Sequence, residues 1–196
     1  MEFLAKFRML FLRILMILLI VLSVMDNDFR AFTLKITAFE SLMISIFGFI
    51  MVLIGSFGRI WASIYIEGNK TRKLITEGPF SMVRNPLYFF SLLIMIGFCL
   101  ALKSIYLGIS LLIIFIFFHF PTILNEESKL KMIHKDEFKK YMDSTPRLFP
   151  NPFIYNIPNS DEILSVKIKK INRNLIQVII IILLYTLIDV LYLILN

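Results

Sequence analysis

The sequence predicts an all-α, polytopic integral membrane protein with about five transmembrane helices. Hydrophobic residues make up 58% of the 196 residues, whereas soluble domains contain about 45–50%. These residues fall into long runs without charge, which is the pattern of membrane spans. The basic residues stand between the runs and are distributed very unequally between the two sides of the predicted membrane.

The length of each apolar run predicts the spans, because a helix needs about 20 apolar residues to cross a hydrocarbon core of ~30 Å. The five spans are residues 9–25, 41–58, 85–102, 104–125 and 174–196. The third and fourth spans meet at Lys103-Ser104, so these two spans form a tight helical hairpin. No small-residue cleavage site follows the first run, and we therefore expect an uncleaved span rather than a signal peptide.

The basic residues predict the orientation. With five spans, every Lys and Arg except Arg30, Lys35 and Lys103 falls on one side of the membrane. The positive-inside rule then places the N-terminus in the cytosol and the C-terminus outside, and we expect a bacterial inner membrane. Contact with anionic headgroups explains the net charge of +7 without nucleic acid.

The single cysteine excludes an intramolecular disulfide. With one cysteine and two histidines, a metal centre is not expected.

Two segments on the cytosolic side are long enough to hold a site, namely residues 59–85 and 126–173. Neither could fold alone, so we expect them to close over each other. An amphipathic helix is predicted over residues 126–142 from four apolar residues at helical spacing: Leu130, Ile133, Phe138 and Tyr141. Prolines predict an extended, helix-free stretch after it: Pro146, Pro150, Pro152 and Pro158. The chain thus divides into N-terminal helices (1–58), a core with the polar motifs (59–153), and a linker with the last span (154–196).

Polar side chains gather at three places that the hairpin topology brings to one membrane face. They are Arg84, Asn85 and Tyr88 at the start of the third span, Glu126 and Glu127 after the fourth, and Tyr141 with Arg147 further on. Each group also has a structural interpretation. Asn85 suits a helix N-cap, Arg84 suits the headgroup level, and the two glutamates suit a first helical turn. These residues alone predict a membrane protein with a cytosolic polar pocket.

The order of the motifs resembles the isoprenylcysteine carboxyl methyltransferase family and the related phospholipid methyltransferases. The motifs are Leu-Ile-Thr-Glu-Gly-Pro-Phe (74–80), Val-Arg-Asn-Pro-Leu-Tyr (83–88), the pair Glu126-Glu127, Phe138 with Tyr141, and Arg-Leu-Phe-Pro (147–150). The resemblance covers residues 58–150, about half of the chain. The chain departs from the family pattern at three positions: Asn85 replaces a His, Lys135 a Gly and Phe138 a Tyr.

The resemblance implies S-adenosylmethionine-dependent methyl transfer at the cytosolic membrane face. The implied acceptor is a membrane lipid or a lipid-linked or amphiphilic molecule, with carboxyl O-methylation of an isoprenylcysteine-like group favoured. Arg147 is the candidate to hold an acceptor carboxylate, and Glu127 is the candidate to accept a proton from an amine. The implied cofactor-binding residues are Phe80, Arg84, Asn85, Pro86, Tyr88, Glu126, Glu127 and Tyr141.

Three alternatives stay open at this point. The first is phospholipid N-methylation. The second is an NADPH-dependent membrane reductase of the sterol type, whose motif has an Asp and Cys element where this chain has Glu126-Glu127. The third is a non-enzymatic scaffold or transporter subunit, which would bind no nucleotide-like ligand.

Several residues inside the spans receive structural predictions. We expect His119 to be structural more than functional, Asp189 to be interfacial, and Trp61 to be an interfacial anchor. Close helix packing is expected at Gly48, Gly55 and Gly58.

Overall fold

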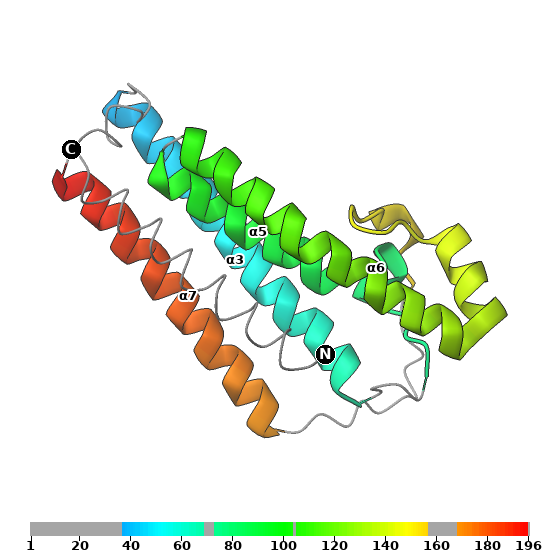
Figure 1. Cartoon of the computed structure of the whole chain (residues 1–196). Coiled ribbons are helices and arrows are strands. Elements are labelled where there is room, and N and C mark those ends of the chain that lie inside the picture. The colour runs from blue at the N-terminus through cyan, green and yellow to red at the C-terminus, as the bar shows by residue number, and fades with distance from the viewer. Residues whose placement is uncertain (1–36, 69–72, 104, 157–167, 196) are drawn as a thin grey trace.

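The computed structural model of the chain describes residues 37–68, 73–103, 105–156 and 168–195, and all of its regular elements are helices. The elements are α3 (Ala38–Gly68), α4 (Pro79–Met82), α5 (Pro86–Leu102), α6 (Ile105–Ser144), the 3₁₀ helix η1 (Pro152–Ile154) and α7 (Ile168–Leu195). The four long helices run side by side along one direction (Figure 1). The predicted all-α fold is therefore confirmed for the described residues.

The long helices carry the apolar character of an integral membrane protein. Among the described residues, three segments are long and apolar enough to cross a membrane: Ala38–Ile66, Gly108–Ser144 and Asn172–Leu191. A fourth apolar helix, Pro86–Leu102, is shorter. These four correspond to the second to fifth predicted spans, while the first predicted span lies outside the described residues.

Glycines allow α3 and α5 to approach closely. A Cβ atom added to Gly55 would lie 2.6 Å from the carbonyl oxygen of Phe90, and one added to Gly97 would lie 2.6 Å from that of Gly48. At Gly58 an added Cβ would overlap the Phe90 ring. The close packing predicted for Gly48, Gly55 and Gly58 is therefore present, and any larger side chain would push the two helices apart.

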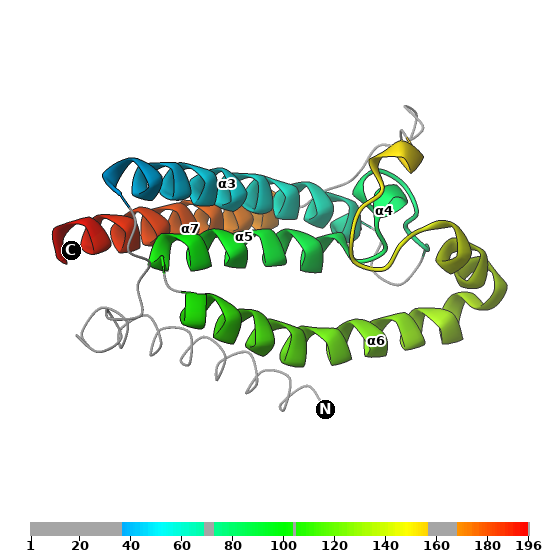
Figure 2. The same ribbon diagram turned by 90° about the horizontal axis from the view of Figure 1, so that it is seen from above.

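The hairpin between α5 and α6 turns at Lys103, as predicted. Lys103 adopts the left-handed conformation (φ 50°, ψ 27°) and its backbone N–H donates to the carbonyl of Leu100. This geometry is a common way for a helix to end. Beyond the turn, α6 lies on the opposite side of α5 from α3, and its far end turns back toward α4 (Figure 2).

Helix α6 joins two elements that the sequence predicted separately, the fourth span and the amphipathic helix. It also contains a break at Lys135, where φ is 41° and ψ is −111°. The break changes which residues face inward: Phe138 and Tyr141 are buried, whereas Ile133 is exposed. The prediction of Ile133 on the buried face was wrong, because the helical repeat does not continue unchanged through Lys135.

The loop after α6 packs against α4. The N–H of Arg84 donates to the carbonyl of Pro146 (2.8 Å), and the N–H of Asn151 donates to the carbonyl of Met82 (3.0 Å). The two segments that we expected to close over each other are therefore in contact. The prediction of a helix-free stretch was wrong at Pro152–Ile154, where Asn151 caps one 3₁₀ turn by accepting from the N–H of Phe153; Pro158 lies outside the described residues.

A polar cluster joins α3, α5 and α7 at the C-terminal end of α5. The Lys103 side chain is completely buried, and its Nζ lies 3.4 Å from Oδ1 of Asp189 on α7. The same oxygen accepts a hydrogen bond of 2.6 Å from Ser45 on α3. The hydroxyl of Tyr185 donates to the Ser45 carbonyl (2.6 Å). The sequence did not predict that Asp189 would pair with Lys103, and we call these residues the Lys103 cluster.

Candidate functional site

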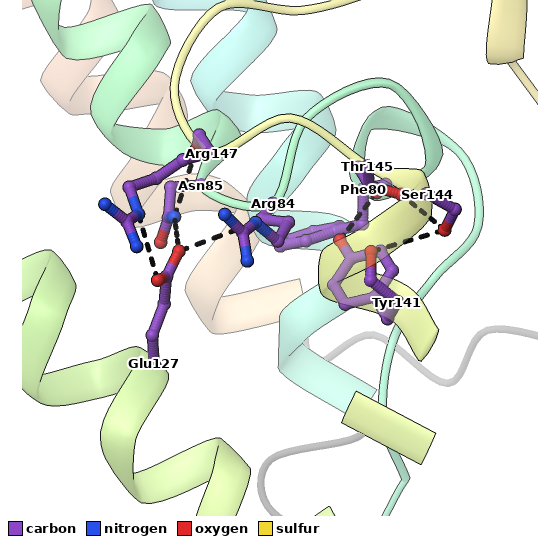
Figure 3. A network of polar contacts seen from close by, with 8 residues as sticks. All are labelled: Phe80, Arg84, Asn85, Glu127, Tyr141, Ser144, Thr145 and Arg147. Carbon is purple, nitrogen blue, oxygen red and sulfur yellow. Dashed lines mark hydrogen bonds and ion pairs between the residues drawn. The ribbon is translucent and has the colours of Figure 1, made fainter. Parts of the chain in front are cut away.

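The carboxylate of Glu127 on α6 contacts side chains from two other segments at the other end of α5 (Figure 3). Its Oε1 accepts a hydrogen bond of 2.9 Å from Nδ2 of Asn85, and Nε of Arg84 lies 3.6 Å from the same oxygen. Its Oε2 accepts from Nε of Arg147 at 3.0 Å. Glu127 is only 6% exposed. We call these four residues the Glu127 network.

Asn85 links the start of α5 to the loop after α6. It occupies the N-cap position, with Pro86 in the first turn, but its side chain makes no capping hydrogen bond. The side-chain amide instead donates to Glu127 and, at 3.0 Å, to the backbone carbonyl of Arg147. Asn85 thus stands at the position of an N-cap, but its side-chain amide links Glu127 to the Arg147 backbone instead of capping the helix.

The charges of the Glu127 network do not balance. Two guanidinium groups face one carboxylate, so the network carries a net positive charge, which is costly to bury without a counter-ion. Nε of Arg84 is buried and has no hydrogen-bond partner within the described part of the chain. The Arg147 side chain is 40% exposed, and its guanidinium carbon lies 6.0 Å from the centre of the Phe120 ring. This arrangement suits an anionic group entering beside Arg147.

Phe80 and Tyr141 form the wall next to the network. The Tyr141 hydroxyl donates to the backbone carbonyl of Phe80 at 2.6 Å (Figure 3). Both residues are buried, Phe80 with Phe90 and Tyr141 with Phe138. This contact ties the end of α6 to α4 and so sets the position of the segment that leads into Arg84.

Tyr88 packs against a histidine of α6, and Glu126 lies at an exposed position. The Tyr88 ring meets His119 edge-on at 5.7 Å between centroids. His119 also stacks on Phe115 at 4.1 Å, and its Nδ1 lies 3.1 Å from the carbonyl of Phe115. Glu126 is exposed, one residue before the buried Glu127. The structure therefore joins Arg84, Asn85, Glu127 and Arg147 directly, with Pro86 buried at the base of α5.

Arg59 and Ser91 form a polar contact between α3 and α5. Neither residue was among the predicted site residues. Nη1 of Arg59 on α3 donates to Oγ of Ser91 at 2.5 Å. Ser91 lies one turn of α5 beyond Tyr88, and the Arg59 side chain is exposed. The available signals were the position of Arg59 directly after an uncharged run and its place at the start of the segment that resembles the family, residues 58–150.

The fold and the site define a helical integral membrane protein with a buried Arg–Asn–Glu network at one end of a helical hairpin. Comparison with known families agrees with this class: residues 41–137 match the model of the phospholipid methyltransferase family. The chain belongs to the phospholipid methyltransferase family through this segment, and the resemblance predicted from the motifs is confirmed.

Two relatives are similar over 128 residues, which is 65% of this chain. The nickel-cobalt-cadmium resistance protein NccN of Alcaligenes xylosoxydans xylosoxydans is 31% identical, and the match covers 58% of its length. The cobalt-zinc-cadmium resistance protein CzcN of Cupriavidus metallidurans is 29% identical, with 57% of its length covered. The chain thus matches less than two thirds of either relative. No solved structure matches the chain significantly.

Proposed function

We propose that this protein transfers a methyl group from S-adenosylmethionine to a lipid-linked or amphiphilic acceptor at the cytosolic face of the membrane. The Glu127 network is the observation that carries the proposal, because it gathers the charged motif residues at one end of the hairpin. The family match, which includes Arg84, Asn85 and Glu127, supports the same activity. The proposal includes a cytosolic N-terminus, which protease accessibility of a terminal tag would test.

The residues present fit the charged parts of S-adenosylmethionine. The excess positive charge of the Glu127 network suits the α-carboxylate, and Arg84, whose buried Nε has no hydrogen-bond partner within the described part of the chain, is the arginine that would meet it. The exposed carboxylate of Glu126 suits the ammonium group. The aromatic ring of Tyr88 suits the sulfonium cation. These assignments use the cofactor-binding residues that the family resemblance implied.

The main task of these residues is to position the reactants. S-adenosylmethionine supplies an electrophilic methyl carbon, and an in-line displacement on it depends chiefly on alignment of the acceptor. Both oxygens of Glu127 are engaged, Oε1 by Asn85 and Arg84 and Oε2 by Arg147. A role as proton acceptor would break one of these contacts. A carboxylate acceptor needs no base, so the network favours O-methylation over N-methylation.

Arg59 adds a second cationic group for an anionic acceptor. Its guanidinium donates to Ser91, whose own hydroxyl donates to the carbonyl of Leu87. The acceptor carboxylate thus has two candidate partners, Arg59 and Arg147. Each would hold it by a charge-assisted hydrogen bond.

Calorimetric titration of the detergent-solubilised protein with S-adenosylhomocysteine and with NADPH tests the cofactor. We expect binding of S-adenosylhomocysteine, its loss in Glu127→Gln, and its retention in the matched control Glu137→Gln, which changes an exposed carboxylate on the same helix. Binding of NADPH alone would favour the reductase, and binding of neither would favour the non-enzymatic alternative.

Transfer of radiolabelled methyl groups to extracted membranes tests the acceptor. A methyl ester releases volatile label in alkali, whereas an N-methylated phospholipid retains it. We expect alkali-labile label that disappears in Arg147→Ala. Alkali-stable label in the phospholipid fraction would instead establish the N-methyltransferase alternative.

A role in metal resistance is a second candidate, favoured by the names of the two relatives. No cluster of three or more His, Cys, Asp or Glu side chains with metal-binding geometry occurs among the described residues. We therefore propose that any such role acts through methylation of a membrane component. Growth of a deletion strain on nickel, cobalt, zinc or cadmium tests this, with resistance restored by the wild-type protein and not by Glu127→Gln. Restoration by Glu127→Gln would separate resistance from methyl transfer.

A further inference from the structure

The loop that supplies Arg147 also displays exposed phenylalanine side chains. Phe153 is 95% exposed and Phe149 is 70% exposed. Both belong to residues 148–156, a stretch that contains no charged residue although the whole chain carries a net charge of +7. We call these nine residues the aromatic loop. An uncharged, aromatic surface of this kind is unusual outside a membrane span.

The aromatic loop is held at both ends, so Phe153 is presented by a fixed backbone. Asn151 donates its N–H to the carbonyl of Met82 (3.0 Å) and accepts from the N–H of Phe153 (3.1 Å). At the other end the N–H of Asn156 donates to Oγ of Ser81 at 2.9 Å. The carbonyl of Asn156 accepts from the N–H of Gly78 at 3.2 Å. Local hydrogen bonds thus turn the Phe153 ring outward.

An aromatic pair places the loop at the level where α3 ends its apolar span. The ring of Tyr155 lies 6.2 Å from that of Trp61, which is five residues before the end of the span Ala38–Ile66. Tyrosine and tryptophan are enriched where a span meets the interface. Figure 2 places η1 beside α4, on the side of α3 rather than on the side of α6. The exposed ring of Phe153 is two residues from this pair.

We propose that the aromatic loop inserts Phe153 into the interface of the same membrane that the helices span. The occupant of the apolar surface is lipid, because the loop has no charge to desolvate and joins an interfacial Trp–Tyr pair. Insertion keeps Arg147, which directly precedes the loop, close to the bilayer surface. An amphiphilic acceptor would arrive there, and this consequence alone rests on the proposed function.

A single tryptophan reporter tests the insertion without any assay of activity. Trp61 is the one tryptophan of the chain, so Trp61→Phe provides a silent background into which Phe153→Trp is introduced. Phe117→Trp, at an exposed position within the apolar part of α6, gives the lipid-facing reference. Asp136→Trp, at an exposed position beside the α6 break, gives the aqueous reference. All variants are reconstituted into phosphatidylcholine–phosphatidylglycerol vesicles with and without brominated acyl chains.

We expect the Phe153→Trp reporter to be quenched by brominated lipid more strongly than Asp136→Trp, to be quenched by acrylamide less strongly, and to emit at shorter wavelength. Quenching equal to that of Asp136→Trp would overturn the proposal, and would point to a soluble protein partner for the loop. If Trp61→Phe does not fold, a spin label at Phe153→Cys in a Cys99→Ala background gives the same comparison. Greater accessibility to a water-soluble relaxant than to oxygen would then overturn it.

Discussion

The Glu127 network and the Lys103 cluster lie at opposite ends of α5, and each pairs a carboxylate with one or more basic side chains. In the Lys103 cluster one lysine faces one aspartate, so the charges balance, and the Lys103 side chain has no exposed surface. In the Glu127 network two arginines face one glutamate, and Arg147 remains partly exposed. Buried ionic groups thus occur in both regions, and the Asp189 side chain is 19% exposed, but an excess of positive charge occurs only in the Glu127 network.

This difference separates two uses of buried charge. A pair whose charges balance holds helices together, because its groups have their partners within the protein. An open and unbalanced group has binding capacity left for a ligand. A buried ion pair in a membrane helix is therefore insufficient evidence for a site. The same type of substitution at the two ends should give different results.

The largest effect is expected from Glu127→Ala, which leaves Arg84 and Arg147 without their shared partner. Removing one member of a buried charge group costs about 3–5 kcal/mol, so we expect a lower free energy of unfolding together with loss of S-adenosylhomocysteine binding. Thermal unfolding in detergent and calorimetry measure the two quantities. Unchanged affinity for S-adenosylhomocysteine in a folded Glu127→Ala variant would show that the Glu127 network is not a binding site for it.

The corresponding change in the Lys103 cluster is Asp189→Leu. It leaves a buried lysine unpaired and should also cost about 3–5 kcal/mol of stability, but ligand affinity of the folded fraction should stay at the wild-type value. The double variant Lys103→Met/Asp189→Leu removes both charges and should recover most of the stability in the same unfolding assay. Loss of ligand binding in that stable double variant would show that the two ends are not independent.

A smaller effect is expected from Tyr141→Phe at the wall of the Glu127 network. The change leaves the buried carbonyl of Phe80 without its donor, which costs about 1–3 kcal/mol. Tyr155→Phe, at an exposed ring, serves as the control and should change stability by less than about 0.5 kcal/mol. Equal unfolding temperatures for the two variants would argue that the Tyr141 hydrogen bond contributes nothing to closing α6 over α4.

The smallest effect is expected at the break in α6, and it is an increase in stability rather than a loss. Lys135 has φ 41° and ψ −111°, a conformation that glycine adopts without strain. Lys135→Gly should therefore raise the free energy of unfolding by about 1 kcal/mol. Lys139→Gly, in the helical segment that follows, should lower it by about the same amount. Destabilisation by both substitutions would mean that the break is not strained.

Much of the fold could be predicted from residue patterns. Uncharged runs identified the helices α3, α5, α6 and α7, and the two-residue interval at Lys103 identified the hairpin. The break at Lys135 could not be predicted from periodicity, because a lysine carries no local signal for that conformation. A family pattern with glycine at this position was the one hint, and it agrees with the backbone that the structure adopts there.

The sequence predicted which residues belong to the candidate site, but not how all of their side chains are arranged. The motifs named Arg84, Asn85, Glu127 and Arg147, which the structure brings into direct contact. The same reasoning grouped Glu126 with Glu127, although neighbouring residues on a helix point in directions about 100° apart. It also treated Asp189 as interfacial by itself, because a partner 86 positions away, Lys103, is invisible to local pattern.

The sequence by itself determined the class of this protein, its apolar helices and the order of its polar motifs, because these depend on local hydropathy and on residue identity. Only the tertiary structure decided which charges meet. Whether a carboxylate pairs with one lysine, as Asp189 does, or with two arginines, as Glu127 does, depends on how distant segments pack. That packing is set by long-range contacts between helices, which no single segment encodes.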